Sequence, residues 1–177
     1  MLKFITFRWY AFPIILICGL CYYFFCYLWV SPLTTVILVR HGDRTGEELN
    51  DLGLARAQEL KRVLSTSNIT TIYASTVNRT QQTAQPLATQ LGLQLHIYNP
   101  NNLQAELVDD IKLHHRGEVI LVVGHSDTVS PTIGLLGVSP APPLIPGNEF
   151  DNLYVVTFGR KVVSKLVQMK YGAPTPL

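Results

Sequence analysis

The chain has 177 residues, of which 47% are hydrophobic and 15% charged, with a formal net charge of +2. This charged fraction is low, since about a quarter is usual in soluble domains. Two cations, Lys3 and Arg8, precede the first long apolar stretch, and the other 12 Lys and Arg residues balance the 12 Asp and Glu residues. A neutral domain lacks the basic surface that nucleic-acid binding requires, so we expect no nucleic-acid partner.

The 22 uncharged residues from Trp9 to Val30 explain the low charge. About 20 apolar residues are enough to cross the hydrocarbon core of a bilayer as a helix. Aromatic residues favour the membrane–water boundary, and they lie near both ends of this stretch (Trp9, Tyr10, Tyr27 and Trp29). A cleaved signal peptide is the alternative, but its apolar core is usually about 7–15 residues and is followed by small residues. We therefore expect residues 9–30 to form an uncleaved transmembrane anchor.

The flanking charges predict the orientation of this anchor. Lys3 and Arg8 lie before it and the next cation is Arg40, and positive charges stay on the cytoplasmic side. The chain then divides into a cytoplasmic N-terminus, a transmembrane anchor and one extracytoplasmic domain (residues 1–8, 9–30 and 31–177). The linker Ser31–Thr34 spans at most roughly 14 Å, so the domain lies close to the bilayer.

Two continuous apolar runs, Thr35–Val39 and Val119–Val123, are typical of strands buried on both faces of a parallel sheet. Between and after them we expect shorter strands (71–74, 94–98, 153–158 and 162–169) and helices (51–65, 77–91, 103–115 and one after 128). This alternation predicts an α/β fold: a three-layer sandwich with a mostly parallel sheet, helices on both faces, and an antiparallel strand or two at the end. The proline-rich loop 139–147 is expected to lie over one edge.

The helix at 51–65 has the clearest start signal. Asn50 or Asp51 can cap it, and Gly53 allows close packing in its first turn. Helical spacing predicts a buried side made of several apolar residues (Leu52, Ala55, Leu60, Val63 and Leu64).

Both buried strands run directly into a motif that contains histidine, Arg-His-Gly at 40–42 and Gly-His-Ser at 124–126, and Arg79 follows a third strand. Sites in α/β sheets lie at the carboxyl ends of the strands. Arginine forks match phosphoryl oxygens, and a neutral imidazole can accept a phosphoryl group as a nucleophile. The sequence therefore predicts a phosphoryl-transfer site (Arg40, His41, Arg79 and His125).

No set of three residues has the spacing of metal ligands. His114 and His115 are adjacent, so they face different sides of a helix and are expected to be solvated. We expect neither a metal nor another cofactor.

Three blocks in this order resemble the histidine phosphatase superfamily, which is phosphoglycerate-mutase-like: residues 40–42, the segment Ser-Thr-Val-Asn-Arg-Thr-Gln-Gln-Thr-Ala at 75–84, and residues 124–126. The resemblance covers about residues 34–158 and suggests a small membrane-anchored member. It implies that His41 is the nucleophile that becomes phosphohistidine. It also implies a phosphate pocket (Arg40, Arg79 and His125).

The segment 40–45 is further similar to the acid-phosphatase branch of that superfamily, in which the second arginine, here Arg44, joins the phosphate pocket. That branch has proline where this chain has Gly46.

The proton donor stays open. The mutase branch uses a glutamate in the region of Glu106, whose neighbours here do not match, and the acid-phosphatase branch has an aspartate directly after its second histidine. Here Ser126 intervenes before Asp127. We favour Asp127, which could instead cap a helix, over Asp43, and a site without a dedicated acid is a further alternative.

The expected function is a membrane-anchored phosphatase that hydrolyses a phosphomonoester through phosphohistidine. The alternatives are a non-catalytic phospho-ligand-binding or scaffold protein, and a phosphomutase, for which the chain lacks cap insertions. The expected substrate is a phosphorylated small molecule or an envelope glycan or lipid. The sequence does not indicate the oligomeric state.

Overall fold

The computed structural model describes residues 15–23, 32–160 and 162–175. The chain divides into two compact units, Met1–Pro32 and Leu33–Leu177. In the first unit, residues 15–23 are helical and their large apolar side chains are exposed. No helix in the described ranges is both long enough and apolar enough to cross a membrane. The anchor at residues 9–30 lies mostly outside the described residues and stays a prediction.

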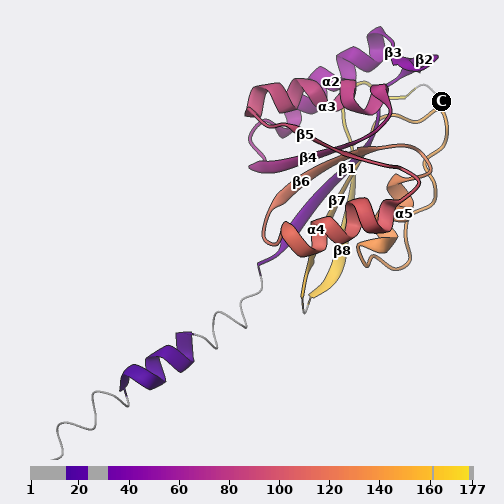
Figure 1. Ribbon diagram of the computed structural model, residues 1–177. Helices are drawn as coiled ribbons and strands as arrows, with labels where there is room; N and C mark the ends of the chain where they lie inside the picture. The colour runs from indigo at the N-terminus through magenta and orange to yellow at the C-terminus, as the bar shows by residue number, and fades with distance from the viewer. Residues whose placement is uncertain (1–14, 24–31, 161, 176–177) are drawn as a thin grey trace, which may run out of the picture. The chain divides into compact units, whose positions relative to one another are not determined.

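The second unit is built on a six-stranded sheet (Figure 1). Its strands, in chain order, are β1 (Thr34–Arg40), β4 (Ile69–Ser75), β5 (Leu95–Tyr98), β6 (Val119–Gly124), β7 (Asn152–Gly159) and β8 (Val162–Lys170). The spatial order is β5-β4-β6-β1-β7-β8, parallel from β5 to β1, with β7 antiparallel to both β1 and β8. The mostly parallel sheet with antiparallel strands at the end is confirmed. A small hairpin, β2 (Arg44–Thr45) and β3 (Glu48–Leu49), follows β1.

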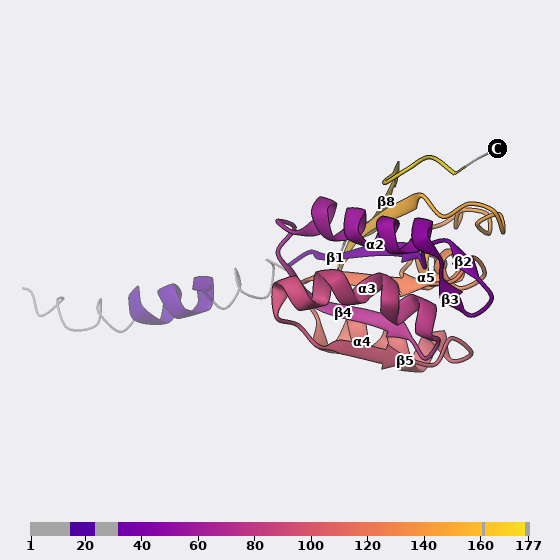
Figure 2. The same ribbon diagram turned by 90° about the horizontal axis from the view of Figure 1, so that it is seen from above.

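Helices cover both faces of the sheet. On one face α2 (Asp51–Leu64) and α3 (Asn78–Leu91) lie side by side (Figure 2). On the other face lie α5 (Val129–Leu135) and a π-helical turn, η1 (Gln104–Val108), which continues into α4 (Asp109–His114). The three-layer arrangement is therefore confirmed.

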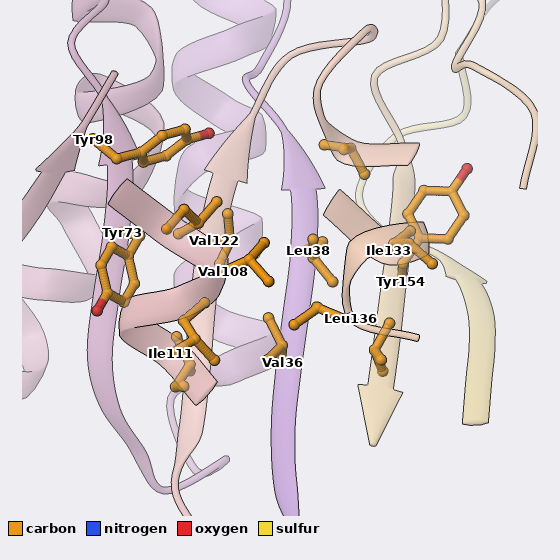
Figure 3. Packing of buried hydrophobic residues seen from close by; sticks show 14 of the residues in the cluster. Val36, Leu38, Tyr73, Tyr98, Val108, Ile111, Val122, Ile133, Leu136 and Tyr154 are labelled. Carbon is orange, nitrogen blue, oxygen red and sulfur yellow. The ribbon is translucent and has the colours of Figure 1, made fainter. Parts of the chain in front are cut away.

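Two apolar cores, one on each face, explain the continuous apolar runs. Val36 and Leu38 of β1 belong to the core with Ile111, Val122 and Ile133 under α4 and α5 (Figure 3), whereas their neighbours Ile37 and Val39 belong to the core under α2 and α3. A strand buried on both faces cannot alternate apolar and polar residues.

The start of α2 fixes the loop that follows β1. Asn50 caps the helix by accepting a hydrogen bond from the backbone N–H of Gly53 (2.9 Å). A Cβ on Gly53 would lie 2.0 Å from the carbonyl oxygen of Asp43, so only glycine permits this contact. The close packing predicted at Gly53 is confirmed.

The predicted buried side of α2 is partly wrong. Leu60 and Leu64 are buried, but Leu52 is 62% and Val63 39% exposed, and Ala55 is exposed too. The stripe that faces the domain consists instead of residues at helical spacing (Gly53, Arg56, Ala57, Leu60 and Leu64). Because the contact of Gly53 with the loop after β1 sets the rotation of the helix, the apolar pattern alone predicted only part of the buried face.

Candidate active site

The carboxyl ends of β1 and β6 bring two histidines together. Arg40 and Gly124 are partners in the parallel register, and the backbone N–H of His41 donates to the carbonyl of Gly124 (3.0 Å). The rings of His41 and His125 therefore lie with centroids 5.4 Å apart in a T-shaped arrangement.

His41 is held as a neutral imidazole. Its side chain is buried, and Nδ1 lies 2.8 Å from the carbonyl oxygen of Gly42. A carbonyl only accepts, so Nδ1 carries the hydrogen and Nε2 carries the lone pair. Burial lowers the pKa of His41 to about 3; the hydrogen bond to Gly42 opposes this shift, and the charge on Arg40 adds to it. At neutral pH the unprotonated Nε2 is therefore available as a nucleophile.

Arg40 is anchored along one edge of its guanidinium. Nη1 donates to the carbonyls of Pro146, Gly147 and Glu149 at 2.8–3.0 Å, and the guanidinium carbon lies 4.0 Å from the ring centroid of Phe150. These carbonyls lie in and just after the proline-rich loop. Burial, with the nearby arginines, lowers the pKa of Arg40 to about 10, so it stays charged at neutral pH. Its Nε is buried and has no hydrogen-bond partner among the described residues.

Arg79, in the first turn of α3, offers a second free donor. Its Nη1 pairs with Glu47 of the β2–β3 hairpin (2.8 Å), while its Nε is buried without a partner in the described part of the chain. An unsatisfied buried donor costs about 1–3 kcal/mol. The backbone N–H groups at the start of α3, where Val77 is the N-cap, also favour an anion. Both arginines therefore line the pocket and carry a buried Nε–H that no described residue satisfies.

A hydroxyl relay fixes the orientation of His125. Its Nε2 lies 2.8 Å from Oγ of Ser75, which lies 2.9 Å from Oγ1 of Thr80. The Thr80 hydroxyl donates to the carbonyl of Val77 (2.7 Å), so Ser75 donates to Thr80 and accepts from Nε2–H of His125. Burial, with the charge on Arg79, lowers the pKa of His125. In neutral His125 the lone pair is therefore on Nδ1. Both ring nitrogens of His125 donate hydrogen bonds only when the ring is protonated.

Sequence reasoning did not assign roles to Ser75 and Thr80. Both belong to the segment 75–84 that carried the family resemblance, but only Arg79 was singled out there. Ser75 ends a buried strand, and this position was the signal in the sequence that could have pointed to a role in the site.

A pocket of about 320 Å³ opens at this edge of the sheet. It is lined by every residue that the sequence placed in the site (Arg40, His41, Arg44, Arg79, His125 and Asp127). Arg44 is exposed, and its guanidinium donates to the carbonyl of Gly46. Pro100 and Asn101, from the loop after β5, also line the pocket and were not anticipated.

The three candidate proton donors occupy different environments. Asp127 is exposed and lines the pocket, and no side chain caps the following helix. Asp43 is buried in an ion pair with Arg56 (2.7 Å). Glu106 accepts hydrogen bonds from Asn99 and Asn102 in the loop before η1. Of these three candidate proton donors, Asp127 is the one that lines the pocket.

A second polar cluster lies away from the pocket. His115 was expected to be solvated, but its side chain is only 14% exposed and lies 2.9 Å from both Glu118 and the Tyr73 hydroxyl. That expectation was wrong, because the short α4 turns His115 back onto the sheet, while His114 stays exposed beside Asp110. Within the described ranges, no three His, Cys, Asp or Glu side chains are arranged to hold a metal ion.

Residues 36–100 match the model of the histidine phosphatase superfamily (branch 1). A comparison with curated proteins gives no match.

Three solved structures share the fold of the domain. The protein histidine phosphatase SixA complexed with tungstate is 18% identical with a TM-score of 0.61, over 77% of this chain and 96% of that one. A putative α-ribazole-5′-P phosphatase from Escherichia coli is 17% identical with a TM-score of 0.59, over the same shares. A mycobacterial glucosyl-3-phosphoglycerate phosphatase complexed with VO3 is 14% identical with a TM-score of 0.60, over 77% and 98%. The domain therefore has the histidine phosphatase fold.

Proposed function

We propose that the protein is a histidine phosphatase that hydrolyses a phosphomonoester through a phosphohistidine at His41. The observation that carries this proposal is a buried neutral imidazole, with its hydrogen held on Nδ1, in a pocket where Arg40 and Arg79 each have an unpartnered Nε–H. The family match over residues 36–100 and the shared fold support it.

In the proposed reaction, Arg40, Arg44 and Arg79 hold the phosphoryl oxygens. Nε2 of His41 attacks phosphorus, the bond from phosphorus to the leaving oxygen breaks, and Asp127 supplies the proton that this oxygen takes up. Water then attacks the phosphohistidine and returns a proton to Asp127, and the N–P bond breaks to release inorganic phosphate and regenerate His41. Positioning and charge stabilisation contribute most of the rate enhancement in such transfers.

The proposed substrate is a phosphorylated small molecule or a phosphorylated envelope glycan or lipid. The structures that share the fold include a protein histidine phosphatase and a glucosyl-3-phosphoglycerate phosphatase. The proposed localisation is a membrane anchor at residues 9–30 with the domain outside the cytoplasm. The basis for the anchor is the uncharged apolar stretch from Trp9 to Val30.

Hydrolysis of 4-nitrophenyl phosphate by the full chain in detergent tests the proposal. We expect steady turnover that His41→Ala abolishes. The matched control is His114→Ala, because the His114 side chain is 68% exposed and lies outside the pocket, and this variant should keep full activity. Binding of inorganic phosphate without turnover would instead indicate a phospho-ligand-binding protein, and transfer between two sugar positions without release of phosphate would indicate a mutase.

A further inference from the structure

The end of the sheet opposite the pocket is the end at which the chain enters the domain. The backbone pairing places Phe158, near the end of β7, directly beside Thr34, the first residue of β1. The turn from β7 to β8 therefore lies beside the point where the chain enters the domain (Figure 1). Because the chain is continuous, this end of the sheet must lie near the surface or partner that binds the segment before Thr34.

Apolar side chains are exposed at this end. Val163, the second residue of β8, is 82% exposed, and Val162 is 44% exposed. Leu33, just before β1, is 48% exposed. Both valines are strand residues of β8, and together with Leu33 they leave three exposed apolar side chains at this end.

Cations surround these apolar side chains. Arg160 is exposed in the turn, and Arg116 is exposed in the loop between α4 and β6. That loop lies against the start of β1, because the backbone N–H of Gly117 donates to Oγ1 of Thr34 (3.0 Å). The last turn of α2 adds Lys61. Helices that connect parallel strands end where the next strand begins, so α2 and α4 end at this same end of the sheet.

The acidic residues of this end contact side chains other than Lys61, Arg116 and Arg160. Glu118 accepts from Thr70 and lies 2.9 Å from His115, and Glu59 pairs with Arg62 at 2.8 Å. Among the described residues, no carboxylate lies within 4.0 Å of the cations at Lys61, Arg116 and Arg160. The basal surface, defined by Leu33, Lys61, Arg116, Arg160, Val162 and Val163, therefore combines exposed apolar side chains with three cations that contact no carboxylate among the described residues.

We propose that this basal surface docks on an anionic lipid bilayer, with Val162 and Val163 at the level of the headgroups. The inference rests on the membrane anchor in the proposed function. The anchor ends about four residues before β1, and chain of that length spans at most roughly 14 Å. Surface cations are attracted to anionic headgroups, and exposed apolar side chains favour the interface.

Docking through the basal surface would determine how far the pocket, and therefore the substrate phosphate, lies from the bilayer. The pocket lies at the carboxyl end of β1, seven residues from its start. At about 3.3 Å per residue, the pocket is held roughly 20 Å from the basal surface. The substrate phosphate is therefore in the water phase, on a soluble molecule or on a headgroup glycan that reaches away from the membrane, rather than on a phospholipid within the bilayer plane.

Tryptophan fluorescence tests the docking directly, because both native tryptophans, Trp9 and Trp29, precede the domain. In a full chain with both replaced by phenylalanine, Val163→Trp provides one reporter at the basal surface. Met169→Trp is the matched control, because it lies on the same strand, six residues away and toward the opposite end. Each variant is reconstituted into vesicles of phosphatidylcholine and phosphatidylglycerol that carry brominated acyl chains.

We expect the tryptophan at 163 to be quenched and blue-shifted and the one at 169 to be unaffected. Each cation near an anionic surface contributes about fivefold to partitioning, so Arg116→Glu with Arg160→Glu should abolish the quenching while turnover of 4-nitrophenyl phosphate stays unchanged. An unquenched reporter at 163 in a chain that resists alkaline extraction from the vesicles would overturn the docking and leave the anchor intact. Release by alkaline extraction would overturn the anchor instead. A blue shift at both positions without quenching would indicate pairing of two copies through β8, which also contradicts the proposal.

Discussion

Nδ1 of His41 lies 2.8 Å from the carbonyl oxygen of Gly42, and this contact determines which nitrogen can react. Gly42 is itself held in place, because its N–H donates to Oγ1 of Thr83 (2.9 Å) and a Cβ on it would lie 2.8 Å from the carbonyl of Gly53. The orientation of the candidate nucleophile is thus set by a backbone loop packed against α2 and α3, which leaves Nε2 for the substrate.

The one-sided anchoring of Arg40 predicts a large effect of Arg40→Lys. A lysine keeps the charge but cannot bind the loop carbonyls through one edge and the phosphoryl oxygens through the other. Loss of one preorganised donor typically costs about 10²–10³ in rate. We expect kcat for 4-nitrophenyl phosphate to fall by about that factor. Unchanged kcat would mean that Arg40 only supports the loop.

Asp127→Asn separates the role of a proton donor from a structural role. If Asp127 protonates the leaving oxygen, the variant should lose most activity on an alkyl phosphate and keep most of it on 4-nitrophenyl phosphate, whose leaving group needs no proton. The measurement is kcat/KM for both substrates. Equal loss of activity on both substrates would exclude Asp127 as the proton donor and leave Asp43 and Glu106 as the candidates.

Glu47 pairs with Arg79, which holds a phosphoryl oxygen in the proposed reaction. The carboxylate of Glu47 is 80% exposed and lies 2.8 Å from Nη1 of Arg79, and exposed pairs of this kind contribute about 0–1 kcal/mol. Glu47→Gln should therefore tighten inhibition by inorganic phosphate by up to roughly fivefold. The matched control is Glu48→Gln, since Glu48 contacts Asn78 and Gln82 instead. Tighter inhibition in both variants would point to the general charge of the hairpin.

The buried neutral state of His41 predicts a pH dependence of stability. Its pKa is about 3 in the folded domain and about 6.5 in the unfolded chain, so the unfolded state binds more protons between these values. Stability should therefore fall as the pH drops below about 6.5, by at most about 1.4 kcal/mol per pH unit from this residue. Urea unfolding of the wild type and of His41→Asn between about pH 5 and 7 measures the difference. Parallel curves for the two proteins would contradict the buried neutral assignment.

Much of this architecture could be predicted because it follows from local pattern. Apolar runs at the positions of β1 and β6 are long enough to require burial on both faces, and the motifs that follow them meet because parallel neighbours end at the same edge. The pocket lining by Arg40, His41, Arg79 and His125 is a consequence of that register.

Other features depend on contacts between distant segments and leave no local pattern. The rotation of α2 is set by the approach of Gly53 to Asp43, and the burial of His115 is set by Tyr73 and Glu118. The anchoring of Arg40 by a loop more than a hundred residues away belongs to the same class. Spacing within the sequence cannot report the tertiary distances on which these features depend.

Trapping of the phosphorylated enzyme tests the central claim most directly. The full chain is mixed with a radiolabelled phosphomonoester, quenched in alkali, where a phosphoramidate is stable, and digested for mapping by mass spectrometry. We predict one phosphorylated residue, His41, whose label is lost in acid and is absent from His41→Ala. Label on any other residue, or turnover by His41→Ala without label, would contradict the account.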